Sequence, residues 1–538
     1  MNFHGSDFTL QRLKHDPDKV QALLATLQVK DDQLQTQAEK IQALQHQLDW
    51  FKRQLFGQKT EKKDFADQPY QTTIAELFDT LPIPEPPKDD KQTVTYVRGT
   101  AKKNVLDGSP DGAQLRFDET VPVEEIHVKS PALEGKDKDD YDIIGEKITY
   151  RLAQKPASFV VLKYVMPTVK RRSTQAISTV SSPNAVFEKS LADVSFLAGM
   201  LVEKFVYHMP LYRQHQRLAN NGIALARSTL TNLVKRAIDL LKPIYQSQLD
   251  HILLSKILAI DETPIKAGKG KKGKLKQGYF WPMMGELDEI CFTFSSSRAM
   301  QHLKTQLGEF NGTILSDGYK AYDLYSESVK TCKPARCWVH CRRYFEKAEA
   351  MEPEASAIAL AYIAKFYHSE KHIKECELEG EKKVDYRLEH TKPVVDAFFA
   401  WVHEQRLRPD LLPSNPLTAA LRYAENQAHG LREFLHDPDL PLDTNHVERA
   451  IRPIAMGRRN WLFCWTELGA EHVGIIQSLL STCRMHDINP YDYLVDVLQR
   501  VSIHPEKHIQ DLTPRCWKDK FSDNPLRSDL YQRNHGLI

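Results

Sequence analysis

The stretch Ile257-Leu258-Ala259-Ile260-Asp261 consists of four apolar residues followed by an acid. The stretch Gly312-Thr313-Ile314-Leu315-Ser316-Asp317 has the same form further along the chain. Short apolar runs of this kind predict buried β-strands. A carboxylate directly after such a strand emerges at the open edge of a sheet, so Asp261 and Asp317 are candidates for one shared site.

The sequence around these two runs predicts the rest of a sheet. Two more strands lie between them, a helix precedes the second run, and a fifth strand and a basic helix follow it. Residues Glu352 to His436 are mostly helical in pattern. The expected elements are strands at Gly278–Met284, Glu289–Phe294 and Pro334–His340, and helices at Ser297–Phe310 and Cys341–Ala348.

A third acid, Glu448, stands near the start of a predicted helix, and no other acid occurs from 449 to 460. Acids after strands one and four, with a late helical acid, indicate a ribonuclease-H-like core. Each acid also has an ordinary explanation, since Asp261 and Asp317 could close turns and Glu448 could pair with Arg452. The basic residues that follow Glu448 are candidates to hold phosphates: Arg449, Arg452, Arg458 and Arg459.

Three carboxylates in these positions favour Mg²⁺ or Mn²⁺, and we expect two ions. Oxygen ligands suit Mg²⁺, and a pair of ions can stabilise the attacking and leaving oxygens of a phosphoryl transfer. A zinc site is not expected at Cys337, His340 and Cys341, because a structural zinc needs about four ligands and no second pair is evident.

The bulk composition is that of a globular chain of three or more domains, with 538 residues, 41% of them hydrophobic and 27% charged. The net charge of +2 says little about partners. The lysines between Lys266 and Lys276 form a local basic stretch that suits a DNA backbone, or else a solvated loop: Lys269, Lys271, Lys272 and Lys274 are its candidates. The eight cysteines are irregularly spaced, which favours reduced thiols and a cytoplasmic protein. No secretory signal or membrane span is expected.

The N-terminal region has apolar residues at every seventh position from Leu13 to Leu55. This period predicts a weak coiled coil that makes a homo-oligomer, or else one amphipathic helix docked on its own chain. Thr60 to about Asp140 is polar and proline-containing, and it predicts a linker with little fixed structure. Ile143 to Met166 predicts a small sheet.

A helix, a glycine turn at Gly222 and a second helix predict a helix-turn-helix between Leu191 and Tyr245, with Ser228 as the N-cap of the second helix. Two helices joined by a turn are common, so this pattern alone does not decide between DNA binding and simple packing. The candidate DNA-binding residues are Arg213, Arg217, Arg227, Ser228, Thr229 and Lys235.

Several motifs, in this order, resemble the transposases of insertion sequence family 66, in the large DDE group, and the resemblance covers nearly the whole chain. It implies that Asp261, Asp317 and Glu448 are a metal-binding triad, and that His340, Arg342 and Arg343 line the active site or the DNA path. His340 could equally be a buried structural imidazole. The motifs are Leu55–Lys62, His208–Arg213 with Ser228-Thr229-Leu230, Asp261-Glu262-Thr263, Asp317–Tyr322, Cys337–Phe345, Glu448–Pro453 with Gly457–Phe463, and Asn489–Leu494.

The chain departs from that family in two places. Members commonly carry a cysteine-rich zinc-binding segment, but Ile143 to Arg172 contains no cysteine. Any DNA contact in this segment must therefore rest on its fold and its basic residues, which are Lys163, Lys170, Arg171 and Arg172. The usual Asn-Asn before the last acid is Thr444-Asn445 here.

We therefore expect a multidomain α+β bacterial transposase that binds terminal inverted repeats and target DNA and performs metal-dependent cleavage and strand transfer. Accessory proteins of the element are possible partners. A catalytically silent DNA-binding regulator and a nuclease without transfer activity are the alternatives. The expected parts are a coiled-coil helix (1–60), a linker (61–140), a small β segment (141–185), a helix-turn-helix domain (186–250), a ribonuclease-H-like core (251–350 and 441–480), a helical insertion (351–440) and a helical tail (481–538).

Overall fold

The computed structural model describes residues 116–537 except 118, 120, 135–137, 156–157, 184, 189, 270–273, 462–463 and 465. The expected coiled coil lies outside the described residues. The chain divides into two units. One comprises Val105–Leu407 and Ala419–Ile538; the other comprises Met1–Asn104 and Arg408–Thr418.

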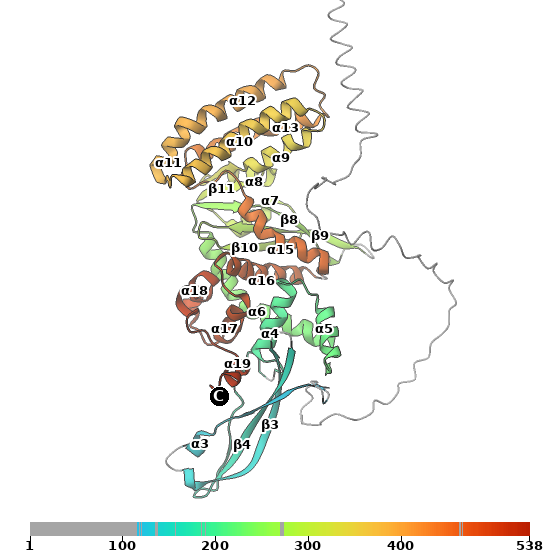
Figure 1. The fold of residues 1–538 in the computed structure, drawn as a ribbon, viewed down its shortest axis with the longest axis vertical. Coiled ribbons are helices and arrows are strands. Elements are labelled where there is room, and N and C mark those ends of the chain that lie inside the picture. Colours follow the sequence, from blue (N-terminus) through green and yellow to red (C-terminus); the bar gives the residue numbers. More distant parts are fainter. Residues whose placement is uncertain are drawn as a thin grey trace, which may run out of the picture. The chain divides into compact units, whose positions relative to one another are not determined.

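A six-stranded mixed sheet forms the centre of the larger unit (Figure 1). Its order is β10-β9-β7-β11-β12, with β8 paired to β9. The β10, β9 and β7 neighbours run antiparallel, whereas β7, β11 and β12 run parallel. The strands are β7 (Ile257–Ile260), β8 (Thr263–Lys269), β9 (Leu275–Met284), β10 (Ile290–Ser295), β11 (Gly312–Ser316) and β12 (Cys332–Arg336).

Helices cover this sheet because its apolar side chains need a partner layer. Leu258 and Ile260 of β7 and Trp281 of β9 are fully buried in one core cluster. The same cluster takes in residues of three helices, which are the end of α6 (Arg227–Ile252), α7 (Met300–Leu307) and α8 (Lys320–Ser328).

The edge strand β10 is sealed by helix α16 (Glu467–Met485). The backbone N–H of Phe292 donates to Ser478 Oγ at 2.8 Å, and that of Ile290 donates to Thr482 Oγ1 at 3.3 Å. Helix hydroxyls thus satisfy backbone groups that an edge strand would otherwise leave open to pairing. Helix α15 (Asn445–Trp461) precedes α16 and packs on β9.

A set of helices lies between β12 and α15 in the sequence, as expected for an insertion, and α10 and α12 run side by side (Figure 1). Its core is aromatic, since Trp338 makes edge contacts with Phe366 and Phe398. The buried Arg387 donates to both carboxylate oxygens of Glu370 at 2.8 Å. The elements are α9 (Trp338–Ala348), α10 (Pro353–Glu375), α11 (Gly380–Tyr386), the π-helix η3 (Arg387–Thr391), α12 (Lys392–Arg406), α13 (Pro416–Asn426), α14 (Ala428–Arg432) and the 3₁₀ turn η4 (Glu433–Leu435).

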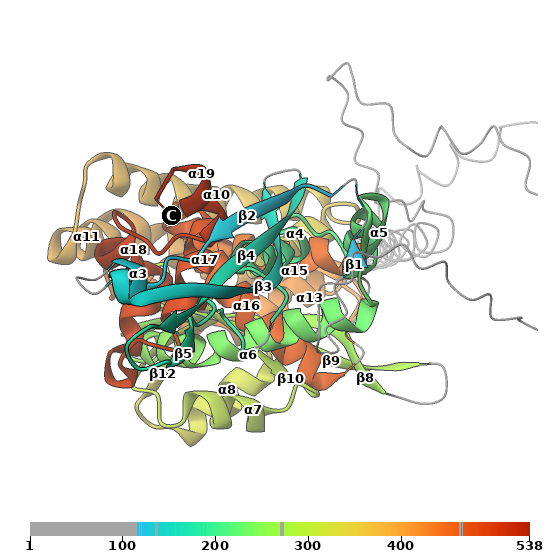
Figure 2. The same cartoon turned by 90° about the horizontal axis from the view of Figure 1, so that it is seen from below.

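A second sheet precedes the central one in sequence (Figure 2). Strands β3 (Tyr141–Lys155) and β4 (Ser158–Arg171) form a long antiparallel hairpin, which confirms the predicted small sheet. Strand β2 (Val123–His127) pairs with β4 in parallel, and β5 (Ile177–Thr179) pairs with it antiparallel. The prediction of an unstructured linker up to about Asp140 is therefore wrong for its last part, because β2 finds its partner in a strand beyond the linker. This part also contains β1 (Arg116–Phe117), α3 (Pro131–Glu134) and η2 (Lys138–Asp140).

The helices predicted between 191 and 245 are α4 (Val194–Phe205), α5 (Leu211–Asn220) and α6. Gly222, with a φ of 75°, turns the chain between α5 and α6, and the short strand β6 (Ile223–Ala224) pairs with β1. The predicted cap is wrong: Ala226 is the N-cap of α6 and Ser228 lies in its first turn. The C-terminal elements are α17 (Pro490–Arg500), η5 (Glu506–Leu512), α18 (Pro514–Phe521) and α19 (Asp529–Asn534).

Two further predictions of elements need correction. Lys266 and Lys269 belong to strand β8, which pairs with β9, so most of the described part of the expected loop is strand. The fifth strand ends at Arg336 rather than His340, because α9 begins at Trp338. His340 therefore lies on the first turn of a helix.

Candidate active site

Asp261 lies at the break between β7 and β8, immediately after the last strand residue, Ile260. Its Oδ1 accepts a hydrogen bond from the backbone N–H of Glu262 at 2.8 Å. Before this break β7 pairs with the C-terminal end of β9, and after it β8 pairs with the earlier part of β9. The carboxylate of Asp261 is thereby held in the short gap between β7 and β8.

Asp317 follows β11, the parallel neighbour of β7, so both acids lie at the C-terminal ends of adjacent parallel strands. Its Oδ1 accepts from the backbone N–H of Tyr319 at 2.9 Å, which makes a tight turn before α8. Gly318 in this turn has no room for a side chain. A Cβ there would lie 2.8 Å from Cε2 of Tyr423 and 3.0 Å from Nε2 of Gln427.

Glu448 is placed by the anchored start of α15. The backbone N–H and the hydroxyl of Thr444 both donate to Cys337 Sγ at 3.3 Å. The backbone N–H of Trp338 donates to the carbonyl of Leu442 at 2.9 Å, so the start of α9 is tied to the segment before α15. These bonds fix the N-terminal ends of α9 and α15 next to each other, so Glu448 faces the first turn of α9.

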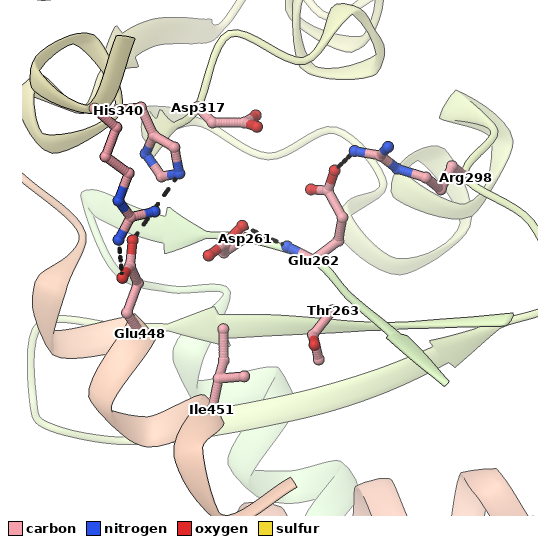
Figure 3. A pocket seen from close by; sticks show the side chains of 9 residues that line it. Asp261, Glu262, Thr263, Arg298, Asp317, His340, Glu448 and Ile451 are labelled. Carbon is pink, nitrogen blue, oxygen red and sulfur yellow. Dashed lines mark hydrogen bonds and ion pairs between the residues drawn. The ribbon is translucent and has the colours of Figure 1, made fainter. Parts of the chain in front are cut away.

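The three acids line one open pocket of about 390 Å³ (Figure 3). They come from segments that lie far apart in the sequence, and the fold brings all three predicted candidates together. Basic and polar side chains complete the wall. The lining residues are Asp261, Glu262, Thr263, Arg298, Asp317, His340, Arg343, Glu448 and Ile451.

Glu448 does not pair with Arg452, the partner that helical spacing suggested. Its Oε2 accepts from Arg343 of α9, and its Oε1 lies 3.9 Å from Nε2 of His340. Oε1 is buried and has no hydrogen-bond partner among the described residues. The pocket thus contains a buried carboxylate oxygen that no donor of the described residues satisfies.

The electrostatics of the pocket reflect this crowding of acids. Burial, and then the negative charges of Asp317 and Glu448, raise the pKa of Asp261 to about 7. The nearby Arg343 and Arg298 oppose the rise only in part. Burial lowers the pKa of His340, which favours its neutral imidazole form. Such a cluster gains from a bound cation, and its oxygen donors are those that hold Mg²⁺ or Mn²⁺.

A second network, which sequence reasoning missed, supports the two strand acids. The buried carboxylate of Glu262 accepts from Arg298 and, at 2.7 Å, from the hydroxyl of Tyr322. The Arg298 guanidinium lies 3.9 Å from the centre of the Tyr319 ring. Glu262 follows Asp261 and Tyr319 follows the Asp317 turn, so the network links the two loops. The only sequence signal was the presence of Glu262, Tyr319 and Tyr322 in the motifs around the acids, and Arg298 lies outside those motifs.

The predicted DNA-binding residues of α5 and α6 divide into two groups. Arg213, Arg227, Ser228 and Lys235 are exposed, and Thr229 is half-buried. Arg217 instead pairs with Glu203 of α4, and its guanidinium lies 4.9 Å from the centre of the Phe159 ring. Its charge is therefore used in packing within the protein.

The other basic candidates lie on three elements. Lys269 and Lys274 are exposed at the two sides of the β8–β9 hairpin, and Lys271 and Lys272 lie outside the described residues. Arg342 pairs with Glu346 one turn along α9. On α15, Arg458 is half-buried and donates to the carbonyl of Pro264. The exposed residues of α15 in this set are Arg449, Arg452 and Arg459.

The bases of the small β segment are mostly neutralised by neighbouring acids. Lys163 pairs with Glu125 at 2.9 Å, and Arg171 pairs with Asp140 at 2.9 Å. Arg172 pairs with Asp142 at 2.6 Å. A DNA contact through this sheet would have to displace those carboxylates. Separately, no helix in the described ranges is long and apolar enough to cross a membrane.

Comparison with known proteins places the pocket within a matched region. Residues 189–472 match the sequence model of a family described as "Transposase IS66 family", and residues 478–515 match one described as "IS66 C-terminal element". Curated relatives from Sinorhizobium fredii (strain NBRC 101917 / NGR234) are similar over most of their length. Uncharacterized protein y4hP is 29% identical over 70% of this chain and 71% of its own, and uncharacterized protein y4jD is 28% identical over 70% of this chain and 76% of its own.

Proposed function

The chain belongs to the IS66 family of transposases, and from this we propose that it cuts and joins DNA at a pocket whose acids are Asp261, Asp317 and Glu448. The single observation that carries the proposal is that these three carboxylates line one open pocket. The strand order β10-β9-β7-β11-β12 supports a ribonuclease-H-like core, since three antiparallel strands are followed by two that run parallel to β7, and acids directly follow β7 and β11. In this proposal the elements from α10 to η4, within residues 351–440, are the insertion between the second and third acids.

The donor set of the pocket fits divalent cations. The unpartnered Glu448 Oε1 and the raised pKa of Asp261 both indicate negative charge that Arg343 and Arg298 offset only in part. Divalent ions bound there would activate a water or a 3′-hydroxyl and stabilise the leaving oxygen at phosphorus. The acids of this chain would hold those ions, and we propose that there are two of them.

The residues around the acids would position the DNA. Arg343 and Arg298 line the pocket, where a guanidinium can hold a phosphate in two-point contact. The exposed Arg449, Arg452 and Arg459 extend positive charge along α15 beyond Glu448. Binding of terminal inverted repeats through α5 and α6, and self-association through residues 1–60, belong to the same proposal, as do any accessory proteins of the element.

A strand-transfer assay with labelled DNA ends and Mg²⁺ or Mn²⁺ tests this function. We expect Asp261→Asn, Asp317→Asn and Glu448→Gln each to lower the transfer rate at least about a thousandfold, because each removes charge from a site where metal and acid act as a unit. The matched control is Asp250→Asn, which removes an exposed acid of α6 and should retain activity.

The outcome also separates the alternative functions. Full transfer by any of the three variants, with the fold checked by circular dichroism, would contradict the proposed site. Cleavage without capture of the labelled end into target DNA would indicate a nuclease. DNA binding with neither reaction in the unmodified protein would indicate a regulator.

A further inference from the structure

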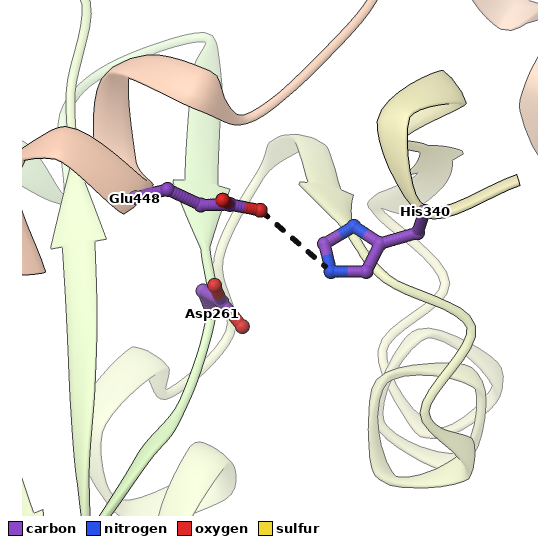
Figure 4. A group of neighbouring side chains, drawn as sticks. All are labelled: Asp261, His340 and Glu448. Atoms are coloured by element: carbon purple, nitrogen blue, oxygen red, sulfur yellow. Dashed lines mark ion pairs between the residues drawn. The ribbon is translucent and has the colours of Figure 1, made fainter. Parts of the chain in front are cut away.

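The tightest group of potential metal ligands in the pocket differs from the three acids. One ligand atom each of Asp261, His340 and Glu448 lies within 4.8 Å of the others (Figure 4). Asp317 lines the same pocket but does not belong to this group. The group therefore joins two carboxylates with an imidazole, a donor that differs in chemistry from a third acid.

The contacts of Glu448 leave the atom that faces the imidazole open. Arg343 occupies Oε2, while the buried Oε1 has no hydrogen-bond partner among the described residues. Oε1 is 3.9 Å from Nε2 of His340, which is beyond hydrogen-bonding distance. A metal ion could bind between Glu448 Oε1 and His340 Nε2, because the two atoms are close and do not hydrogen-bond to each other.

His340 is held in this position by the start of α9. The indole N–H of Trp338 donates to the carbonyl of Leu431 at 2.8 Å, and Cys341 is fully buried. The backbone around the histidine is thus fixed on both sides. Nδ1 of His340 is buried and has no hydrogen-bond partner in the described part of the chain, so no contact there turns the ring away from Glu448.

We propose that Asp261, His340 and Glu448 form a mixed nitrogen and oxygen site for a divalent transition ion, such as Mn²⁺ or Co²⁺, with His340 as a direct ligand. Imidazole suits transition ions, whereas Mg²⁺ prefers oxygen ligands, so His340 would make this site favour the former class. The inference deepens the proposed function, because it rests on the same pocket and concerns which ion its acids hold. Asp317 lines the same pocket but would not be a ligand in this group.

Pulsed electron paramagnetic resonance of the full-length protein with one equivalent of Mn²⁺ tests the assignment directly. We expect modulation from a histidine ¹⁴N nucleus in the unmodified protein, and its loss in His340→Gln. We also expect His340→Gln to weaken Mn²⁺ binding, measured by calorimetry, at least about tenfold, with a change in Mg²⁺ affinity below about threefold.

The matched control is His446→Gln, because His446 lies on α15 two residues before Glu448 but does not line the pocket. This variant should keep the nitrogen signal and the Mn²⁺ affinity. Should His340→Gln fail to fold, labelling the unmodified protein with ¹⁵N-histidine gives an independent measurement. The ¹⁴N modulation must then be replaced by that of ¹⁵N.

Three results would overturn the inference: no histidine coupling in the unmodified protein, coupling that persists in His340→Gln, or coupling that His446→Gln abolishes. The strand-transfer assay distinguishes these from failure of the proposed function. Transfer that depends on Asp261, Asp317 and Glu448, together with bound Mn²⁺ lacking nitrogen coupling, would leave the function standing and remove His340 from the ligands.

Discussion

At the scale of single residues, Glu262 shows that adjacent acids can have different tasks. Both acids line the pocket, but Asp261 lies beside Glu448, whereas the carboxylate of Glu262 accepts from Arg298 and Tyr322. Tyr322 also packs edge-on against Trp281 in the core, with ring centres 6.0 Å apart. Glu262 therefore connects the first acid to the interior of the protein, and we regard it as a positioning residue.

Removal of this carboxylate should cost stability. Glu262→Ala leaves the buried Tyr322 hydroxyl without its acceptor, and we expect a loss of about 1–3 kcal/mol in the free energy of unfolding. Glu262→Gln keeps an acceptor and loses only the pairing with the partly exposed Arg298, so it should cost less than about 1 kcal/mol. Urea denaturation measures both.

A double-mutant cycle serves as the control for that prediction. If Glu262 and Tyr322 stabilise each other, Glu262→Ala and Tyr322→Phe together will cost less than the sum of the two single changes. Strict additivity would mean that the network is incidental to the fold.

At the scale of elements, the insertion helix α13 rests on the turn that carries Asp317. Gly318→Ala places a methyl group against the Tyr423 ring, and we expect a loss of about 1–3 kcal/mol from overpacking. The displacement should also move Asp317 and slow strand transfer. Unfolding by urea and the transfer assay measure the two effects.

The second-site change Tyr423→Leu tests whether the clash is the cause. It removes the ring atom that the new methyl group meets, so Gly318→Ala with Tyr423→Leu should recover at least half of the lost stability. A double variant as impaired as the single one would locate the damage elsewhere in the turn.

The elements also show what the sequence could predict. β7 and β11 were predictable because each is an apolar run ended by an acid, and that pattern depends on local residues. β8 was missed because its lysines and glycine favour a loop, and only pairing with β9 makes it a strand. Likewise β2, whose sequence contains two glutamates, is a strand because β4 lies beside it.

The candidate site divides in the same way. The three acids were predictable from strand ends and order along the chain. The roles of Arg298 and Tyr322 were not, since they contact Glu262 across 36 and 60 positions. The partner of Glu448 was also missed, because helical spacing proposed Arg452 while the fold supplied Arg343.

At the scale of the whole larger unit, the C-terminal tail is joined to the early sheet. The Tyr164 hydroxyl donates to Asp529 at 2.6 Å across 365 positions of sequence. Arg151, whose guanidinium lies over the Tyr164 ring, is 3.6 Å from the same carboxylate. Asp193, buried at the start of α4, lines one cavity together with Arg151 and Asp529, and burial raises the pKa of Asp193 to about 6.

This buried acid should make stability depend on pH. An aspartate in an unfolded chain has a pKa of about 3.9, so the folded protein holds a proton more tightly between about pH 4 and 6. The free energy of unfolding should fall as pH rises through that window, by about 3 kcal/mol. Asp193→Asn keeps an acceptor for the backbone N–H of Ser195 but has no charge to bury.

The difference in unfolding free energy between Asp193→Asn and the unmodified protein should therefore grow in favour of the variant from pH 4 to pH 7. Urea titrations at several pH values measure this difference. Asp250→Asn provides the exposed control, whose difference should stay flat. Parallel curves for Asp193→Asn would show that its carboxyl is not protonated in the folded protein.

The dispersal of the pocket along the chain has a consequence for biosynthesis. The last strand of the central sheet ends at Arg336, and Glu448 leaves the ribosome about 110 residues later. At about 5–20 residues per second this interval lasts roughly 5 to 20 s. The hydroxyls that seal β10 arrive later still, on α16. A nascent chain thus carries two of its acids well before the third, and cannot assemble the complete carboxylate pocket until translation has passed the insertion.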